Sequence, residues 1–212
     1  MLLVINRNGS KNVKVQTIRR KGSEAKFVSI MENIDDWLQK IPERVGNYLA
    51  GFADGEGSFI VALTKRDDYV LGWKVIMIFN VAQRDQTVLN LFKKYLGCGR
   101  MQYRKDGVWY YIISNPRAIH ERVIPFFKRF SFFSSIKKKN FSIFQQVGKI
   151  MVKGGHYTQE GLQEVMELRE QLNVGAGRKR KYEISHYKQW LSENPQRLHA
   201  RVKYRPKHLG KL

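Results

Sequence analysis

Two pairs of alternating segments constrain the fold of this chain more than any other feature. Apolar and polar residues alternate over 58–66 and again over 73–83, and a shorter pair flanks the turn Lys105-Asp106-Gly107. Alternation with a period of two is typical of strands that bury one face against a core. The sequence therefore predicts an α+β fold in which two hairpins form one antiparallel four-stranded sheet, with helices packed on one face.

Helical patterns precede, separate and follow the two hairpins. Asp85 and Thr158 are typical N-terminal capping residues, and Gly97 is a typical helix terminator. The predicted helices cover 43–54, 86–96, a segment opened by Asn115-Pro116, 137–151 and 158–172.

The sequence predicts a core flanked by two arms. The core spans 44–173, and the N-terminal arm, 1–43, carries a predicted strand at 13–18 and a predicted helix at 29–41. The tail, 174–212, is basic. Its charge pattern predicts either a solvated segment or an additional phosphate-binding arm.

The net charge indicates a polyanionic partner. Thirty-nine Lys and Arg stand against eighteen Asp and Glu, a formal net charge of +21, and such a field attracts nucleic acid. We expect no membrane partner, because no apolar run is long enough to span a bilayer and no basic amphipathic helix is evident. The short apolar start is no secretory signal, so we expect an intracellular protein, of a prokaryotic cytoplasm or an organelle.

Two acids lie where the first core helix meets the first strand. Asp54 and Glu56 are separated by Gly55, and the helix macrodipole opposes negative charge at a C-terminus by about 0.3–1 kcal/mol per exposed charge. A bound divalent cation would offset this, since Mg²⁺ takes carboxylate and carbonyl oxygens and a helix end offers free carbonyls. The alternative for an isolated Asp-Gly-Glu is a solvated turn.

Small residues follow one stripe of the same helix. Gly46, Ala50 and Ala53 recur at helical spacing, with Gly57 beyond them, while Tyr48, Leu49 and Phe52 are expected to enter the core. A stripe of small residues lets two helix backbones pack closely. It either packs against the sheet of its own chain or forms a dimer contact that brings two copies of Glu56 together.

Several segments carry a family resemblance. "YLAGFADGEGSF" resembles the signature of the LAGLIDADG homing endonucleases, which are encoded within mobile introns and inteins, and "FNVAQRDQTVLNLFKKYLGCGRM", "NPRAIHERVIPFF", "SIKKKNFSIF" and "YTQEGLQEVMELREQLN" resemble later segments in the same order. The resemblance covers 47–173 and implies an αββαββα core whose sheet forms a DNA-binding saddle. Because the signature occurs once in this chain, it implies a homodimer rather than a single-chain pseudo-dimer.

The resemblance also implies roles for individual residues. Glu56 matches the acid that binds the catalytic Mg²⁺ or Mn²⁺, the Gly55 carbonyl is a further ligand, and Asp54 matches a structural acid at the helix end. Gln83 matches a position that organises water near the metal. Lys137 is chosen as the basic residue near the scissile phosphate, although Lys138 or Lys139 could fill that place.

The open face of the predicted sheet is the expected DNA-binding surface. A β-ribbon fits the major groove, where Arg, Lys, Asn and Gln reach base edges and apolar side chains touch thymine methyls. Two copies imply a long, roughly palindromic target. Alternation places the following residues on this face: Ser58, Ile60, Ala62, Thr64, Arg66, Lys74, Ile76, Ile78, Asn80, Arg100, Gln102, Arg104, Val108, Tyr110 and Ile112.

These observations favour a metal-dependent enzyme that hydrolyses one phosphodiester in each strand of duplex DNA. An RNA-splicing maturase of the same fold, which would bind intron RNA, is the alternative, because some members of the family assist splicing. A DNA-binding regulator that has lost the metal site is disfavoured by the presence of Asp54, Glu56 and Gln83.

Overall fold

The structure is a computed structural model that describes residues 36–174 and 180–197. The compact unit Leu38–Leu212 contains the sheet and the helices packed on it. The strand predicted at 13–18 and most of the helix predicted at 29–41 lie outside the described residues.

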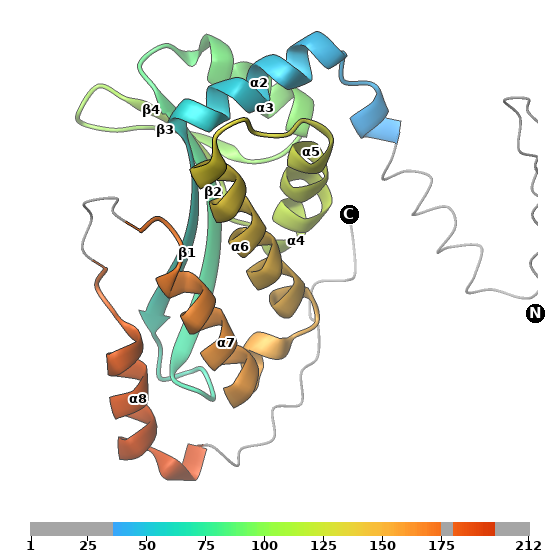
Figure 1. The fold of residues 1–212 in the computed structure, drawn as a ribbon. Helices are drawn as coiled ribbons and strands as arrows, with labels where there is room; N and C mark the ends of the chain where they lie inside the picture. The colour runs from blue at the N-terminus through green and yellow to red at the C-terminus, as the bar shows by residue number, and fades with distance from the viewer. Residues whose placement is uncertain (1–35, 175–179, 198–212) are drawn as a thin grey trace, which may run out of the picture. The chain divides into compact units, whose positions relative to one another are not determined.

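Helices and strands follow the predicted order, so the α+β fold is confirmed (Figure 1). The element that follows Asn115-Pro116 is divided into two short α-helices with a π-helical turn between them. The elements are α2 (Glu43–Glu56), β1 (Gly57–Lys65), β2 (Trp73–Gln83), α3 (Gln86–Leu96), β3 (Arg100–Tyr103), β4 (Trp109–Ile113), α4 (Pro116–Ala118), the π-helical turn η1 (Ile119–Val123), α5 (Ile124–Arg129), α6 (Ser135–Val152), η2 (Gly155–Tyr157), α7 (Gln159–Glu170), α8 (Ile184–Glu193) and η3 (Pro195–Arg197).

The four strands form one antiparallel sheet in the order β1-β2-β4-β3. Alternate residues of β1 and β2 are buried, and this face packs under the helices. Phe59 lies at the centre of the core, with its ring centroid 5.0 Å from that of Phe144 and 5.4 Å from that of Phe79. The other face of the sheet carries no helix among the described elements, so it is available to a partner.

Local signals set the ends of the helices as predicted. The Asp85 carboxylate accepts a hydrogen bond from the Thr87 amide at 2.9 Å, and Gly97 ends α3 in the left-handed region with φ 65°. The π-helical turn η1 precedes Pro125, which has no N–H and would clash with a regular helical carbonyl four residues earlier. The wider turn accommodates this proline inside a continuous helical segment.

The segment Arg180–Arg197 packs on the core, so this part of the basic tail is not the solvated segment that was one of its two predicted forms. Tyr187 and Trp190 of α8 are buried. The Arg180 guanidinium binds the last turn of α7, where it donates to the carbonyl oxygens of Arg169 at 2.8 Å and Leu172 at 2.6 Å. This arginine therefore neutralises a helix C-terminus and is committed to the fold.

Within the part of the chain that the structure describes, no helix has the length and apolar character needed to cross a bilayer.

Candidate active site and nucleic-acid interface

The two acids lie at a junction where a helix passes directly into a strand. α2 continues two residues beyond its predicted end, to Glu56, and Gly57 both caps it and begins β1. The Gly57 amide donates to the Ala53 carbonyl, and a Cβ at residue 57 would lie 2.5 Å from that oxygen. A glycine is therefore required for this tight passage, which leaves Glu56 exposed at the end of the sheet.

Asp54 is bound to the start of another helix. Its Oδ2 accepts hydrogen bonds from the amides of Phe133 and Ser134, each at 2.9 Å, and Ser134 is the N-cap of α6. Burial raises the pKa of this carboxyl, but the hydrogen bonds from Ser134 and Phe133 outweigh burial and hold the pKa below its usual value. The positive end of α6 thus compensates the unfavourable end of α2.

Replacing Asp54 with asparagine is expected to lower the free energy of unfolding at pH 7 by about 0.5–1 kcal/mol, because the amide keeps an acceptor oxygen for the two N–H groups but loses the negative charge at the positive end of α6. Because the folded-state pKa lies below the unfolded value of 3.8, the contribution of the carboxylate is complete above that pH and is lost as the pH falls through the folded pKa. Urea unfolding of both proteins at pH 7 and at pH 3 measures it. A difference that grows toward acid would contradict this assignment.

Lys137 is the one lysine of the 137–139 run that reaches the junction. Its Nζ donates to the Gly57 carbonyl oxygen, whereas Lys138 and Lys139 are exposed. Burial lowers the pKa of Lys137, and the carboxylates of Asp54 and Glu56 act in the opposite direction. A cationic group therefore lies beside the two acids.

The strand register places Gln83 at the same end of the sheet. Gly57 pairs with Val81 in an antiparallel ladder, so the last residue of β2 and the last residue of α2 lie at one edge. The Gln83 Oε1 accepts a hydrogen bond from the Arg84 amide at 2.8 Å. The structure thus gathers Asp54, Glu56, Gln83 and Lys137 at one site.

The donor set of this site fits a hard cation that other molecules help to bind. Glu56 offers an exposed carboxylate, Gly55 a helix-end carbonyl, and the buried Oδ1 of Asp54 has no hydrogen-bond partner. Among the described residues there is no group of three or more His, Cys, Asp or Glu that could hold a metal. One chain would therefore supply only part of a coordination shell, and phosphate, water or a second chain would supply the rest.

The predicted dimer contact through Gly46, Ala50 and Ala53 is wrong. These residues are buried within their own chain, and a Cβ at residue 46 would lie 2.3 Å from the ring of Phe130. The stripe serves close packing inside the chain, but at Gly46 the neighbour is Phe130 at the end of α5 and not the sheet that the alternative interpretation named.

The opposite face of α2 is the exposed one. Gly51 and Gly55 are exposed, and a Cβ added to either would meet no atom within 4 Å. Tyr48, expected in the core, is 51% exposed. Beside the junction, Phe133 is 89% and Ile136 71% exposed. Sequence reasoning missed both: Phe133 lies in the run "SFFSS", which has no helical or strand period, and Ile136 follows that run directly.

The open face of the sheet carries the residues that alternation placed there. Ser58 pairs with Asn80, Asn80 with Ile112, and Ile112 with Arg100, so these four residues form one row across all four strands. The Arg104 guanidinium lies 3.9 Å from the centre of the Tyr110 ring. Ile112 is only 7% exposed, so its predicted direct contact with a base is wrong: its neighbours cover it.

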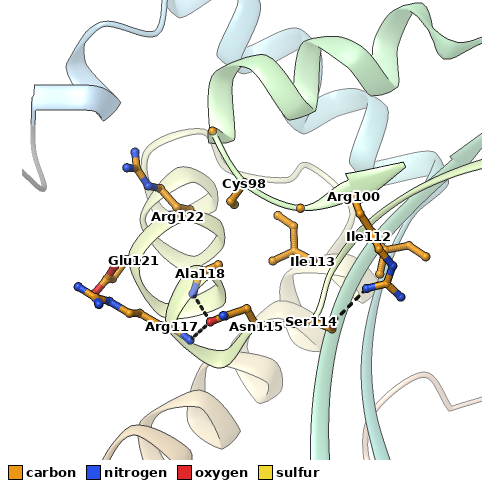
Figure 2. A pocket seen from close by; sticks show the side chains of 12 residues that line it. Cys98, Arg100, Ile112, Ile113, Ser114, Asn115, Arg117, Ala118, Glu121 and Arg122 are labelled. Atoms are coloured by element: carbon orange, nitrogen blue, oxygen red, sulfur yellow. Dashed lines mark hydrogen bonds and ion pairs between the residues drawn. The ribbon is translucent and has the colours of Figure 1, made fainter. Parts of the chain in front are cut away.

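A hollow of about 380 Å³ lies at the edge of this face, between the start of β3, the end of β4 and α4. Figure 2 shows Asn115 turned toward the amides of Arg117 and Ala118, and Arg100 reaching Ser114. None of the four gathered residues lines it. The hollow is therefore a basic edge of the sheet and not the centre of the candidate site.

Comparison with known proteins agrees with this geometry. Residues 49–148 match the family model for LAGLIDADG endonuclease. The chain is 30% identical over 133 residues to a probable intron-encoded endonuclease 2 of Neurospora crassa, covering 61% of this chain and 29% of that protein. It is 28% identical over 102 residues to the homing endonuclease I-ApeII of Aeropyrum pernix, covering 47% of this chain and 60% of that protein.

The chain thus spans less than two thirds of the length of these relatives. Among solved structures, it matches the archaeal intron-encoded homing endonuclease I-Vdi141I complexed with DNA with a TM-score of 0.64 and 25% identity, over 71% of this chain and 96% of that one. It matches the meganuclease I-SmaMI bound to DNA with a TM-score of 0.60 and 32% identity, over 64% of this chain and 47% of that one. The fold is that of the LAGLIDADG homing endonucleases.

Proposed function

We propose that this chain is one subunit of an intron-encoded, site-specific endonuclease that hydrolyses both strands of duplex DNA with a bound divalent metal. The observation that carries the proposal is the junction itself. An exposed carboxylate, Glu56, and a half-buried ammonium group, Lys137, lie together at the end of an open sheet face in a chain of net charge +21. Relatives named as intron-encoded or homing endonucleases support it.

Each gathered residue has a separate task in this reaction. A divalent ion held by the Glu56 carboxylate and the Gly55 carbonyl, when bound, stabilises charge on the attacking and leaving oxygens of the phosphodiester. The Lys137 ammonium group stabilises charge on the phosphate oxygens, and the Gln83 amide orients the attacking water. Asp54 fixes the end of α2 against α6, so the other groups keep their positions.

We further propose that two copies form the enzyme through the exposed face of α2. Gly51 and Gly55 let two helix backbones approach closely. The same contact would bury the exposed side chains of Phe133 and Ile136. The chain spans nearly the whole of one solved homologue and about half of a longer one, which supports one such junction per chain. An isologous contact would bring the two Glu56 carboxylates toward the two scissile phosphates.

The open sheet face would read the target. Ile60, Ile76 and Ile78 remain partly exposed on the face that also carries Lys74 and Arg100, a mixture that suits thymine methyls and guanine edges in the major groove. Two such faces related by a two-fold axis predict a long, roughly palindromic site.

Selection of cleaved fragments from a randomised duplex library in Mg²⁺ tests the function. We expect enrichment of one extended sequence with approximate two-fold symmetry, and no enrichment in EDTA. If no library member and no intron-insertion sequence is cut while the protein binds intron RNA tightly, the splicing alternative replaces this proposal.

Changing Lys137 to methionine is expected to lower the single-turnover cleavage rate about 100-fold, within the range for removal of one preorganised electrostatic group. Methionine keeps the unbranched apolar stem of lysine and removes its charged end, so the folded state is retained. Lys138→Met is the matched control, because its side chain is exposed on the next residue of the same helix. Equal effects of the two changes would reduce the role of Lys137 to general phosphate attraction.

A further inference from the structure

Arg66 pairs with an acid at the far end of the first hairpin. Arg66 donates to Asp68 through both Nε and Nη2, each at 2.8 Å. Both side chains are exposed, at 50% and 61%, and an exposed ion pair contributes little to folding stability. An aspartate also repels DNA phosphate, so its place at the tip of a DNA-facing hairpin calls for a reason other than stability.

The register keeps Arg66 on the open face of the sheet. The pairing of Lys65 with Trp73 continues through a hydrogen bond from the Arg66 amide to the Gly72 carbonyl at 2.8 Å. Arg66 therefore extends the alternation of Ser58 to Thr64 by one step. Its side chain starts from the surface that faces DNA in the proposed function.

The turn that carries the pair is held from outside the hairpin. Trp190 of α8 covers Gly72, where a Cβ would lie 2.3 Å from the indole ring, and Trp73 packs edge-on against Tyr182 at 5.0 Å. Arg197 donates to carbonyl oxygens of the same turn. α8 lies beside the ends of β1 and β2 (Figure 1). The Arg66–Asp68 pair therefore lies on a packed turn and not on a free loop.

The pairing leaves one edge of the guanidinium available. Asp68 occupies the Nε–Nη2 edge, and the remaining donors lie on Nη1 and the outer hydrogen of Nη2. Two parallel donors of this kind match O6 and N7 of guanine, the commonest specific contact in the major groove. Because the carboxylate fixes the plane of the guanidinium, the arginine is oriented before it meets DNA.

We propose that Arg66 reads a guanine in the outer part of each half-site, and that Asp68 is the positioning residue that aligns it. This inference rests on the proposed endonuclease function. Nine residues of extended chain separate Arg66 from Gly57, about 30 Å at 3.3 Å per residue. At 3.4 Å per base pair, this length corresponds to a guanine about nine base pairs from the cleaved phosphate.

The test compares base preferences in the selection of cleaved duplexes for the wild-type protein, Asp68→Asn, Arg66→Ala and Asp67→Asn. Asp67→Asn is the matched control, because it removes the same charge from the same turn but its carboxylate does not contact Arg66. We expect Asp68→Asn to reduce the preference for guanine about tenfold at one outer position of each half-site, Arg66→Ala to abolish it there, and Asp67→Asn to leave it unchanged.

Two results overturn the inference while the proposed function stands. In the first, the wild-type protein cuts DNA but Asp68→Asn reduces guanine preference at no position. In the second, Asp67→Asn loses as much guanine preference as Asp68→Asn, which would make the effect one of charge alone. In DNA-free protein, the Arg66 Nε–H resonance is expected to be protected from exchange and to lose this protection in Asp68→Asn. A wild-type protein that cuts no DNA overturns the proposed function together with this inference.

Discussion

Replacing Glu56 with glutamine is expected to lower the rate of strand cleavage by about three orders of magnitude or more, with little change in DNA affinity. The side chain is exposed at the α2–β1 junction, so the isosteric change should alter the free energy of unfolding by less than about 0.5 kcal/mol. An amide is a neutral and much weaker ligand for a hard cation. The variant would lose several kcal/mol of charge stabilisation at the phosphate, and each 1.36 kcal/mol lowers the cleavage rate tenfold.

Single-turnover cleavage and filter binding in the same buffer measure the two effects separately. Glu43→Gln is the matched control, since Glu43 is exposed in the first turn of the same helix and carries the same charge far from the junction. Cleavage by Glu56→Gln at near wild-type rate would remove this carboxylate from the chemistry, and loss of cleavage in both variants would indicate a general effect of charge.

The two acids that looked alike in the sequence divide into a structural and a chemical one. Asp54 is bound to amides of Phe133 and Ser134, about 80 positions along the chain, so no local pattern could indicate its partner. Glu56 accepts no such backbone hydrogen bonds within the described part of the chain and remains exposed. The sequence located the pair, because dipole opposition is a local argument, but tertiary contacts decided which acid serves the fold.

The strands were predictable for a physical reason. A period of two fixes which residues of β1 and β2 are buried, and a slip by one residue would expose Phe59 and Phe79 together. Ile112 departs from the prediction because alternation assigns a face but not the cover that neighbouring side chains provide.

Small residues on α2 showed the limit of periodicity more clearly. Glycine or alanine lies on both sides of this helix, and the sequence favoured the stripe with Gly46. Which stripe is buried depends on Phe130, a residue far along the chain at the end of α5 that contacts the helix only through the tertiary fold. Likewise, the positive charge of the C-terminal segment concealed the buried face of α8, formed by Tyr187 and Trp190.

Replacing Gly51 with glutamate is expected to make the single chain slightly more stable and the enzyme inactive. No atom lies within 4 Å of the added Cβ, and glycine is the poorer residue inside a helix by up to about 1 kcal/mol. In the proposed dimer, however, the new side chains would separate the two α2 backbones and place like charges across the two-fold axis. The variant should therefore sediment as single chains and cut neither strand.

Gly46→Ala provides the opposite control. Its new methyl group would overlap the Phe130 ring, so overpacking should lower the free energy of unfolding by about 1–3 kcal/mol, while the folded fraction still pairs and cuts DNA. Sedimentation equilibrium, urea unfolding and cleavage of one duplex, measured on both variants, separate the two faces of the helix. A Gly51→Glu protein that remains dimeric would move the contact away from α2, because no close approach of the two helices tolerates paired glutamates there.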